Sequence, residues 1–194
     1  SSIRYTPSGR IETLIYNVGN NTYSFNYQYD NTGNLIRSTR SDRQGTTLTT
    51  RQTIYTYGRN NELIGERWLN DNNEVVYAVT YTYDLAGNLI QSITYDNNVN
   101  PVRTIYIYNR YNQLIEELRG VPSDLFDRYT GDVVNLTTGD QAQEQRLYEY
   151  DTAGNLAVLT HAQGRRNYLY DSWNRLITVS GQNDEGETIR TSIQ

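Results

Sequence analysis

The chain has 194 residues, of which 36% are hydrophobic and 20% charged, and its formal net charge is -5. This size suits one domain or one segment of a longer protein. The absence of cysteine excludes disulfides, thiol catalysis and cysteine-based zinc sites. The acidic balance disfavours a nucleic-acid surface, and no apolar run approaches the roughly 18 residues of a membrane-spanning helix, so we expect no membrane insertion.

A short cassette recurs along the chain: Tyr-x-Tyr, then Gly or Asn four residues after the second tyrosine, then Leu two residues later. An incomplete copy, "RYTPSGRI", comes first, with Gly9 and Ile11 at these two places. Six copies follow, and together they use 12 of the 19 tyrosines. Their tyrosine pairs, in chain order, are Tyr27/Tyr29, Tyr55/Tyr57, Tyr81/Tyr83, Tyr106/Tyr108, Tyr148/Tyr150 and Tyr168/Tyr170.

The cassette predicts a β-hairpin. Tyr-x-Tyr places two rings on one face of a strand, because side chains alternate. The next residue is usually Asp, which accepts backbone N–H bonds in turns, although Gly58 and Asn109 replace it in two copies. Gly or Asn then adopts the left-handed conformation and closes the turn with a bulge. The expected structural turn residues are Asp30, Gly33, Asn61, Asp84, Gly87, Asn112, Asp151, Gly154, Asp171 and Asn174.

A second set of turn signals, among them "SDRQG", "NDNNE" and "HAQG", ends the return strands. Each repeat is therefore two strands and two turns. Residues 1–194 predict a single all-β segment of about seven repeats, a continuous antiparallel meander of roughly 14 strands that forms a curled sheet, a shell or an open barrel segment.

The pattern Tyr-Asp-x-x-Gly-x-Leu, as in Tyr83-Asp84 through Gly87 to Leu89, resembles the YD-repeat or RHS-repeat family. That family includes RHS polymorphic toxins, shell components of Tc toxins, wall-associated proteins and teneurins. The resemblance covers nearly the whole chain and implies a β-sheet scaffold that is secreted or displayed at the cell surface. Encapsulation and self-cleavage are not carried over, because seven repeats are too few for a shell and no Asp-Pro signature is present.

Residues 119–145 interrupt the repeat spacing with a longer, irregular excursion. "RYTGDVV" within it echoes "RYTPSGRI", which favours a decayed repeat or a plain excursion. The alternative is a protruding loop that meets a partner, since long loops are often functional. The sequence leaves both interpretations open.

No residue pattern predicts a catalytic, cofactor or metal site, and we expect no enzyme activity. His161 lies in a predicted turn and is interpreted as solvated. The acidic stretch 184–187 matches no EF-hand spacing and is interpreted as a solvated turn, with Ca²⁺ binding as the alternative. Glu116 and Glu117 would point to opposite faces of a strand, and Arg165/Arg166 is too short for a phosphate track. The tyrosine pairs are expected to form cross-strand aromatic ladders rather than to stack on sugars.

The chain begins and stops inside a repeat, so we expect either an excerpt of a longer chain or a processed tile. Its expected partners are other YD repeats of a longer chain or neighbouring copies, joined head to tail through unpaired sheet edges. The leading hypothesis is a non-catalytic extracellular scaffold: a wall or sheath element, a shell segment or a self-assembling fibre subunit. The alternatives are a segment of a toxin-encapsulating shell and a carbohydrate-binding module that uses exposed Tyr and Trp173.

Overall fold

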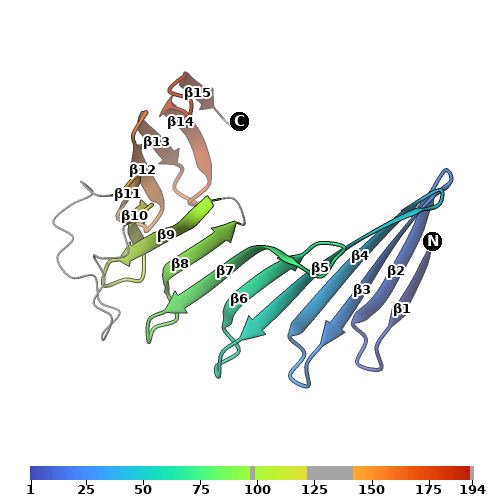
Figure 1. Ribbon diagram of the computed structural model, residues 1–194. Coiled ribbons are helices and arrows are strands. Elements are labelled where there is room, and N and C mark those ends of the chain that lie inside the picture. The colour runs from blue at the N-terminus through green and yellow to red at the C-terminus, as the bar shows by residue number, and fades with distance from the viewer. Residues whose placement is uncertain (97–98, 122–141, 193–194) are drawn as a thin grey trace. The chain divides into compact units, whose positions relative to one another are not determined.

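The computed structural model describes residues 1–96, 99–121 and 142–192, which form fifteen β-strands (Figure 1). The strands are hydrogen-bonded in chain order, from β1 to β15, without a crossover. The all-β antiparallel meander predicted from the sequence is confirmed, and β1 and β15 stand at opposite ends of the strand order. Among these residues, none belongs to a helix long and apolar enough to cross a membrane.

The strand bounds follow the cassette, since each odd strand from β3 to β13 ends at the second tyrosine of a pair. The strands are β1 (Ser2–Tyr5), β2 (Ile11–Val18), β3 (Asn21–Tyr29), β4 (Leu35–Gln44), β5 (Thr47–Tyr57), β6 (Leu63–Leu69), β7 (Val75–Tyr83), β8 (Leu89–Asp96), β9 (Val99–Tyr108), β10 (Leu114–Arg119), β11 (Glu144–Tyr150), β12 (Leu156–His161), β13 (Gly164–Tyr170), β14 (Leu176–Gln182) and β15 (Thr188–Ser192).

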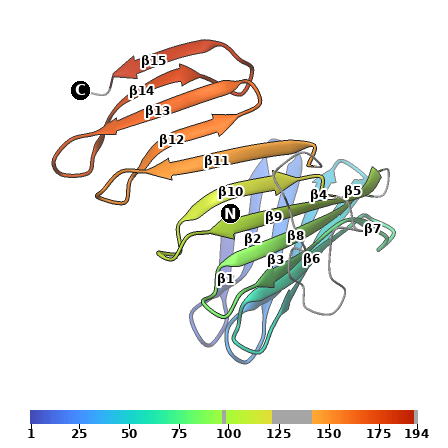
Figure 2. The same ribbon diagram turned by 90° about the vertical axis from the view of Figure 1, so that its left-hand side faces the viewer.

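The strands divide into two compact units. Unit 1 comprises residues 1–81 and 93–101, and unit 2 comprises residues 82–92 and 102–194. In unit 1 the turns that join β1 to β2, β3 to β4 and β5 to β6 lie along one edge (Figure 1). In unit 2 the turns between β11 and β12 and between β13 and β14 likewise share an edge (Figure 2). We call these the cassette edges of the two units.

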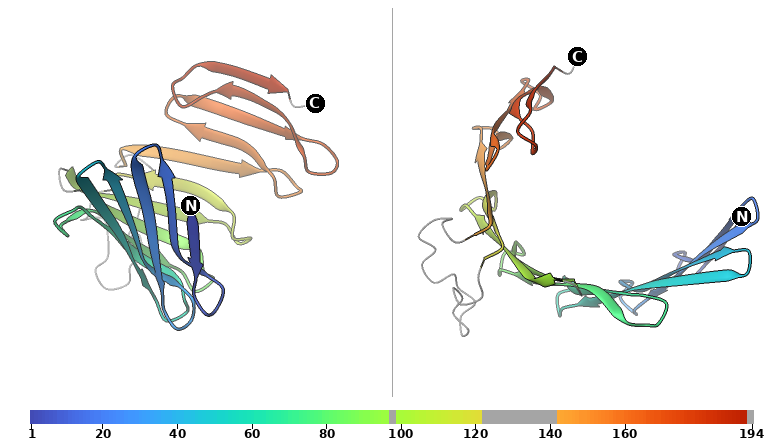
Figure 3. Two further views of the ribbon diagram at one scale, coloured as in Figure 1. Left: turned by 90° about the vertical axis from the view of Figure 1, so that its right-hand side faces the viewer. Right: turned by 45° about the horizontal axis from the view of Figure 1, so that its top comes forward.

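Each unit is a sheet one layer thick (Figure 3), so buried apolar side chains are few. Tyrosine pairs lie on the less exposed face: in β3, Tyr27 and Tyr29 are half-buried whereas Gln28 between them is exposed. In β13, Leu169 is exposed between two half-buried tyrosines in the same way. The alternation of a strand thus decides which face carries the tyrosine rings.

A small apolar cluster forms in unit 2, where Ile105, Leu118 and Val121 are buried against Ile107 and Ala142. The cluster lies beside the place where β10 and β11 pair directly, with Arg119 opposite Glu144. Of the irregular excursion predicted at 119–145, residues 122–141 lie outside the described part of the chain.

The cassette turns interrupt the ladder at the second tyrosine. In the β3–β4 pair the register shifts between Gln28 and Tyr29, so that Tyr29 faces Leu35. Backbone φ is positive at the glycine or asparagine that precedes the return strand, for example 87° at Gly87 and 64° at Asn61. The turn therefore needs a residue that tolerates the left-handed region, and Gly and Asn tolerate it best.

We expect Gly87→Val to lower the free energy of unfolding by about 1–2 kcal/mol, because a side chain disfavours the left-handed region. A Cβ at Gly87 meets nothing within 4 Å, so the cost is backbone strain alone. Gly87→Asn is the matched control and should cost much less, since Asn61 and Asn112 already have this conformation. Urea unfolding of both variants measures the difference, and equal stabilities would contradict the turn assignment.

Candidate functional site

The carboxylate of Asp84 organises the turn between β7 and β8. Its Oδ1 accepts hydrogen bonds from the backbone N–H groups of Ala86 at 2.9 Å and Asn88 at 2.8 Å. Its Oδ2 accepts a bond from the Asn88 side-chain amide at 2.8 Å. The Gly87 N–H donates to the Asp84 carbonyl at 3.1 Å. One side chain therefore satisfies the donors that the turn would leave exposed.

The same arrangement recurs in the other cassette turns that begin with Asp or Asn. Asn109 replaces the carboxylate with its amide oxygen, which accepts the N–H groups of Tyr111 and Gln113. At Gly58 the acceptor comes from the opposite side of the turn, because Glu62 Oε2 accepts the Asn60 N–H at 2.8 Å. The turn residues that follow the Asp84 pattern are Asp30, Asp151 and Asp171.

These hydrogen bonds stabilise the ionised carboxylates. The hydroxyl of Thr32 is the main cause that lowers the pKa of Asp30 from 3.8 to about 2, and partial desolvation opposes it. Side-chain amides of Asn88 and Asn155 are the main cause of the lowered pKa values of Asp84 and Asp151. The turns that begin with Asp are therefore built around a charged acceptor.

In four of the pairs, the second tyrosine joins its hairpin to the preceding one. Tyr57, at the end of β5, donates its hydroxyl to the backbone carbonyl of Leu35 at 3.0 Å. Leu35 begins β4, before the β4–β5 ladder, which starts at Arg37. We call this bond the tyrosine clip. It recurs from Tyr29 to Ile11, from Tyr108 to Leu89 and from Tyr150 to Leu114, at 2.7–3.0 Å.

In some pairs the first tyrosine binds a polar side chain on the preceding return strand. Tyr81 donates to Glu66 Oε1 at 2.7 Å, and Tyr148 donates to Glu117 Oε2 at 2.9 Å. Burial, together with Glu117, raises the pKa of Tyr148 to about 12. Glu116, next to Glu117, instead accepts a bond from Gln145.

Aromatic ladders were expected from the tyrosine pairs, but the hydroxyl bonds give them another role. The ring stacks in unit 1 involve aromatics outside the pairs: Tyr16 with Tyr23 at 5.1 Å between centroids, and Trp68 with Tyr77 at 4.7 Å. The tyrosine clip needs a phenol rather than a phenyl ring. This requirement gives a physical reason for a chain that has 19 tyrosines and two phenylalanines.

A third contact links the tips of consecutive cassette turns. The side-chain amide of Asn34 donates to the side-chain oxygen of Asn61 at 3.1 Å, although 27 residues separate them. We call this the asparagine bridge. It recurs from Asn88 to Asn112 and from Asn155 to Asn174, both at 3.0 Å.

The bridge explains why glycine and asparagine alternate at the left-handed position. In a turn with Gly at that position, such as Gly33, the next residue, Asn34, donates its side-chain amide to the bridge. In the following turn, Asn61 occupies the left-handed position and its side-chain oxygen accepts. The hairpins are thus grouped in twos. Sequence reasoning treated Gly and Asn as equivalent, and the alternation from Gly33 to Asn174 was the signal it missed.

Unused halves of the tyrosine clip lie at the two ends of the strand order, and also between β12 and β13, where the Tyr170 hydroxyl has no hydrogen-bond partner in the described part of the chain. Tyr5, at the end of β1, occupies the place of the second tyrosine, and it is 55% exposed. In the described part of the chain its hydroxyl has no hydrogen-bond partner. At the other end, Leu176 begins the return strand β14, and no described tyrosine donates to its carbonyl.

The remaining sequence candidates lie in or beside the non-cassette turns of unit 2. The acidic stretch 184–187 forms an ordinary turn, in which Asn183 Oδ1 accepts the N–H groups of Glu185 and Glu187. Across the residues that the structure describes, no group of three His, Cys, Asp or Glu side chains is arranged to hold a metal ion. His161 was interpreted as solvated, and this is wrong: its side chain is 4% exposed, because it lies against Gln163 and Asp184.

No protein-family profile matches the chain, and no curated protein matches it by sequence. Among solved structures, TcdB2-TccC3 without its hypervariable C-terminal region is 16% identical, with a TM-score of 0.39. That likeness covers 92% of this chain and 11% of the other, so this chain spans about a ninth of its length. Porin-like proteins from Bacteroides uniformis and Bacteroides vulgatus are 11% and 13% identical, each with a TM-score of 0.34. Those two likenesses cover 93% and 97% of this chain and 91% and 90% of the porin-like chains.

We expect Tyr57→Phe to lower the free energy of unfolding by about 1 kcal/mol, because it deletes the donor and leaves the Leu35 carbonyl without it. Tyr5→Phe is the matched control, since the exposed Tyr5 hydroxyl makes no clip. Urea unfolding of the two variants gives the comparison. A Tyr57→Phe variant as stable as the Tyr5→Phe variant would show that the clip contributes nothing.

Stability should fall as the pH drops from about 4 to about 2. The folded pKa of Asp30, about 2, lies below the ordinary value of 3.8. Its contribution is therefore fully present above the ordinary value and is lost as the pH falls through the folded one. The Asp30→Asn variant keeps a side-chain oxygen that accepts the turn hydrogen bonds, but it has no carboxyl group that titrates. In urea unfolding from pH 4 to 2, the free energy of unfolding of this variant should fall less than that of the wild type. If both fall equally with pH, the Asp30 turn is not the source of the acid sensitivity.

Proposed function

We propose that the chain is a non-catalytic structural scaffold of the YD-repeat type, which works outside the cell or at its surface. In this proposal its neighbours are further hairpins, supplied by the same longer chain or by other copies arranged head to tail. The observation that carries the proposal is the tyrosine clip, because every clip joins one hairpin to the next. A protein built on such a joint extends by repetition.

Each clipped hairpin uses two complementary groups: a tyrosine hydroxyl that points back and a carbonyl that receives the next hydroxyl. The hairpin containing Tyr29 and Leu35 shows both, since Tyr29 donates to Ile11 and Leu35 accepts from Tyr57. Tyr5 at one end is a donor without an acceptor among the described residues. Leu176 at the other end offers the matching acceptor. The two ends are therefore chemically complementary.

The edge strands leave room for a further strand as well as for a clip. β1 pairs with Ile11–Ile15 of β2, so the last three residues of β2 have no ladder on that side. β15 pairs with Thr178–Gln182 of β14, which leaves Leu176 and Ile177 unpaired there. Unpaired strand edges are templates for β-pairing. A further hairpin would supply both the missing ladder and the missing clip.

The roles of the repeated polar residues support a structural function. The carboxylates of Asp30 and Asp84 bind their own turns, and the hydroxyls of Tyr57 and Tyr150 bind backbone carbonyls. Groups engaged in this way hold the turns and the joints between hairpins in place. The sequence resemblance to the YD-repeat family supports the location outside the cell, and it keeps a segment of a toxin-encapsulating shell as the first alternative.

A carbohydrate-binding surface module is the second alternative. Trp173 projects from the turn between β13 and β14 and is 75% exposed. The guanidinium of Arg175 lies over its ring, 4.9 Å from the centroid. Exposed aromatic rings suit sugar stacking, and Trp173→Ala would remove glycan binding without affecting assembly if this alternative held.

Sedimentation velocity and electron microscopy over a concentration series test the proposal. We expect the wild-type chain to form open head-to-tail assemblies as its concentration rises. Ile3→Lys should prevent them, because a lysine on the edge strand β1 disfavours pairing with another strand. Leu169→Lys is the matched control, with a similarly exposed apolar residue on the interior strand β13. Dispersed monomers of the wild type at high concentration would contradict assembly between copies.

A further inference from the structure

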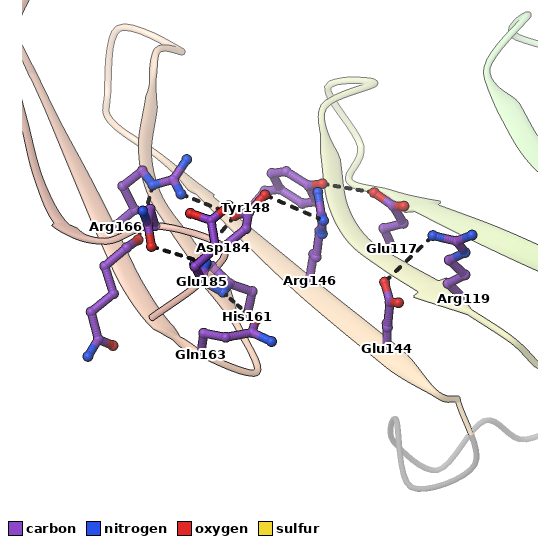
Figure 4. Close-up of polar contacts among 12 residues, drawn as sticks. Glu117, Arg119, Glu144, Arg146, Tyr148, His161, Gln163, Arg166, Asp184 and Glu185 are labelled. Carbon is purple, nitrogen blue, oxygen red and sulfur yellow. Dashed lines mark hydrogen bonds and ion pairs between the residues drawn. The ribbon is translucent and has the colours of Figure 1, made fainter. Parts of the chain in front are cut away.

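Three basic or imidazole side chains from neighbouring strands converge on the carboxylate of Asp184 (Figure 4). Arg166 of β13 donates from Nη2 to Asp184 Oδ1 at 3.1 Å. Arg146 of β11 places Nη2 3.9 Å from Oδ2, and His161 of β12 places Nε2 4.0 Å from Oδ1. Asp184 itself belongs to the turn between β14 and β15. Three consecutive strands of unit 2 and one turn therefore contribute to one cluster, which we call the Arg/His cradle.

His161 carries an unsatisfied polar atom in this cradle. Its Nδ1 lies 3.0 Å from Gln163 Oε1, and because that oxygen only accepts, Nδ1 donates to it. With that proton on Nδ1, Nε2 is the ring nitrogen left to accept a hydrogen bond. This atom is buried and has no hydrogen-bond partner, since 4.0 Å to Asp184 is beyond hydrogen-bonding distance. A buried polar atom of this kind calls for a ligand group or a water that can satisfy it.

A cavity of about 300 Å³ opens beside these groups. This volume lies at the low end of small-molecule sites, which span roughly 300–1,000 Å³. Three side-chain amides contribute to its wall, and amides both donate and accept hydrogen bonds. The lining residues are Gln143, Glu144, Gln145, Arg146, His161, Ala162, Gln163 and Asp184.

Asp184 is weakly held in the cradle by its basic neighbours. Its side chain is 58% exposed, and it forms one direct hydrogen bond to a guanidinium, whereas the contact with Arg146 is longer. Guanidinium groups bind carboxylates best through two parallel hydrogen bonds. Arg146, which also contacts the Tyr148 hydroxyl, therefore has donors that Asp184 does not use.

The charges of the cradle select a singly charged ligand. Arg146 and Arg166 supply two positive charges around Asp184, although only Arg146 lines the cavity itself, and Asp184 and Glu144 supply two negative charges to its wall. A phosphate dianion would meet both carboxylates at close range. One carboxylate can enter when the exposed Asp184 moves aside.

We propose that the Arg/His cradle binds a sugar acid, and that Asp184 is a built-in competitor for its carboxylate. The ligand carboxylate binds Arg146 and Arg166 in the place of Asp184. A ligand hydroxyl donates to His161 Nε2, and other hydroxyls bind the amides of Gln143, Gln145 and Gln163. This site is separate from the cassette turns and the tyrosine clips. The ligand-binding proposal is therefore tested independently of the scaffold role.

Calorimetric titration of the intact chain with glucuronate tests the proposal, at a protein concentration where sedimentation shows one species. We expect saturable binding that is at least about tenfold tighter than binding of acetate or glucose. Acetate has the carboxylate without the hydroxyls, and glucose has the hydroxyls without the carboxylate. No saturation with glucuronate would overturn the proposal. Equal affinity for acetate, or for the capped amino acid N-acetylglutamate amide, would overturn the assignment to a sugar acid.

Two variants with opposite expected effects sharpen the test. Arg146→Gln should weaken glucuronate binding about tenfold, because it removes a charged donor. Asp184→Asn should strengthen binding roughly two- to fivefold, because it removes the competitor. Arg59→Gln, on an exposed turn of unit 1, is the control and should change nothing. Weaker binding by Asp184→Asn, with an unchanged melting temperature, would overturn the competitor role.

Discussion

A hydrogen bond from a tyrosine hydroxyl to the first carbonyl of the preceding return strand holds successive hairpins in place. In a sheet one layer thick, little apolar burial is available to do so. The described residues include six buried hydrophobic side chains, and three of them belong to the cluster around Leu118. Ladder hydrogen bonds alone tolerate a slip of two residues, which keeps every side chain on its face. The clip removes that freedom, because Tyr57 reaches the Leu35 carbonyl in one register.

The turn chemistry depends on the same constraint. The Asp acceptor and the left-handed Gly or Asn place the second tyrosine and the first leucine of the return strand at fixed positions within each hairpin. Once the clip has aligned two hairpins, their turn tips come close enough for Asn34 to reach Asn61. The asparagine bridge accompanies the clip in this pair, but it does not require it, because Asn155 reaches Asn174 in hairpins that no clip joins among the described residues. It adds a second period, of two hairpins, to the period of one hairpin that the tyrosines set.

The two edges of unit 2 differ in how strictly the repeat determines their residues. The cassette edge uses nearly every polar group to build turns, clips and bridges. The opposite edge joins the strands with connections of different length and sequence, and there the charges of Arg146, Arg166 and Asp184 gather around His161. Connections that need not repeat are free to carry a ligand site, as loops on a rigid scaffold often do.

Local sequence determined the strands and the turns of this protein. Tyr-x-Tyr, the following Asp and the Gly or Asn four residues after the second tyrosine span seven positions, so one hairpin suffices to specify them. Asp84 and Gly87 could be assigned their turn places from the cassette alone. Tertiary structure decided the partners of the tyrosine hydroxyls, because Tyr29 and Ile11 or Tyr150 and Leu114 are 18 and 36 residues apart. It also decided the burial of His161, since the Asp184 side chain that it lies against comes from a turn 23 residues away. These contacts depend on the spacing and register between hairpins, and no short pattern within one hairpin encodes either.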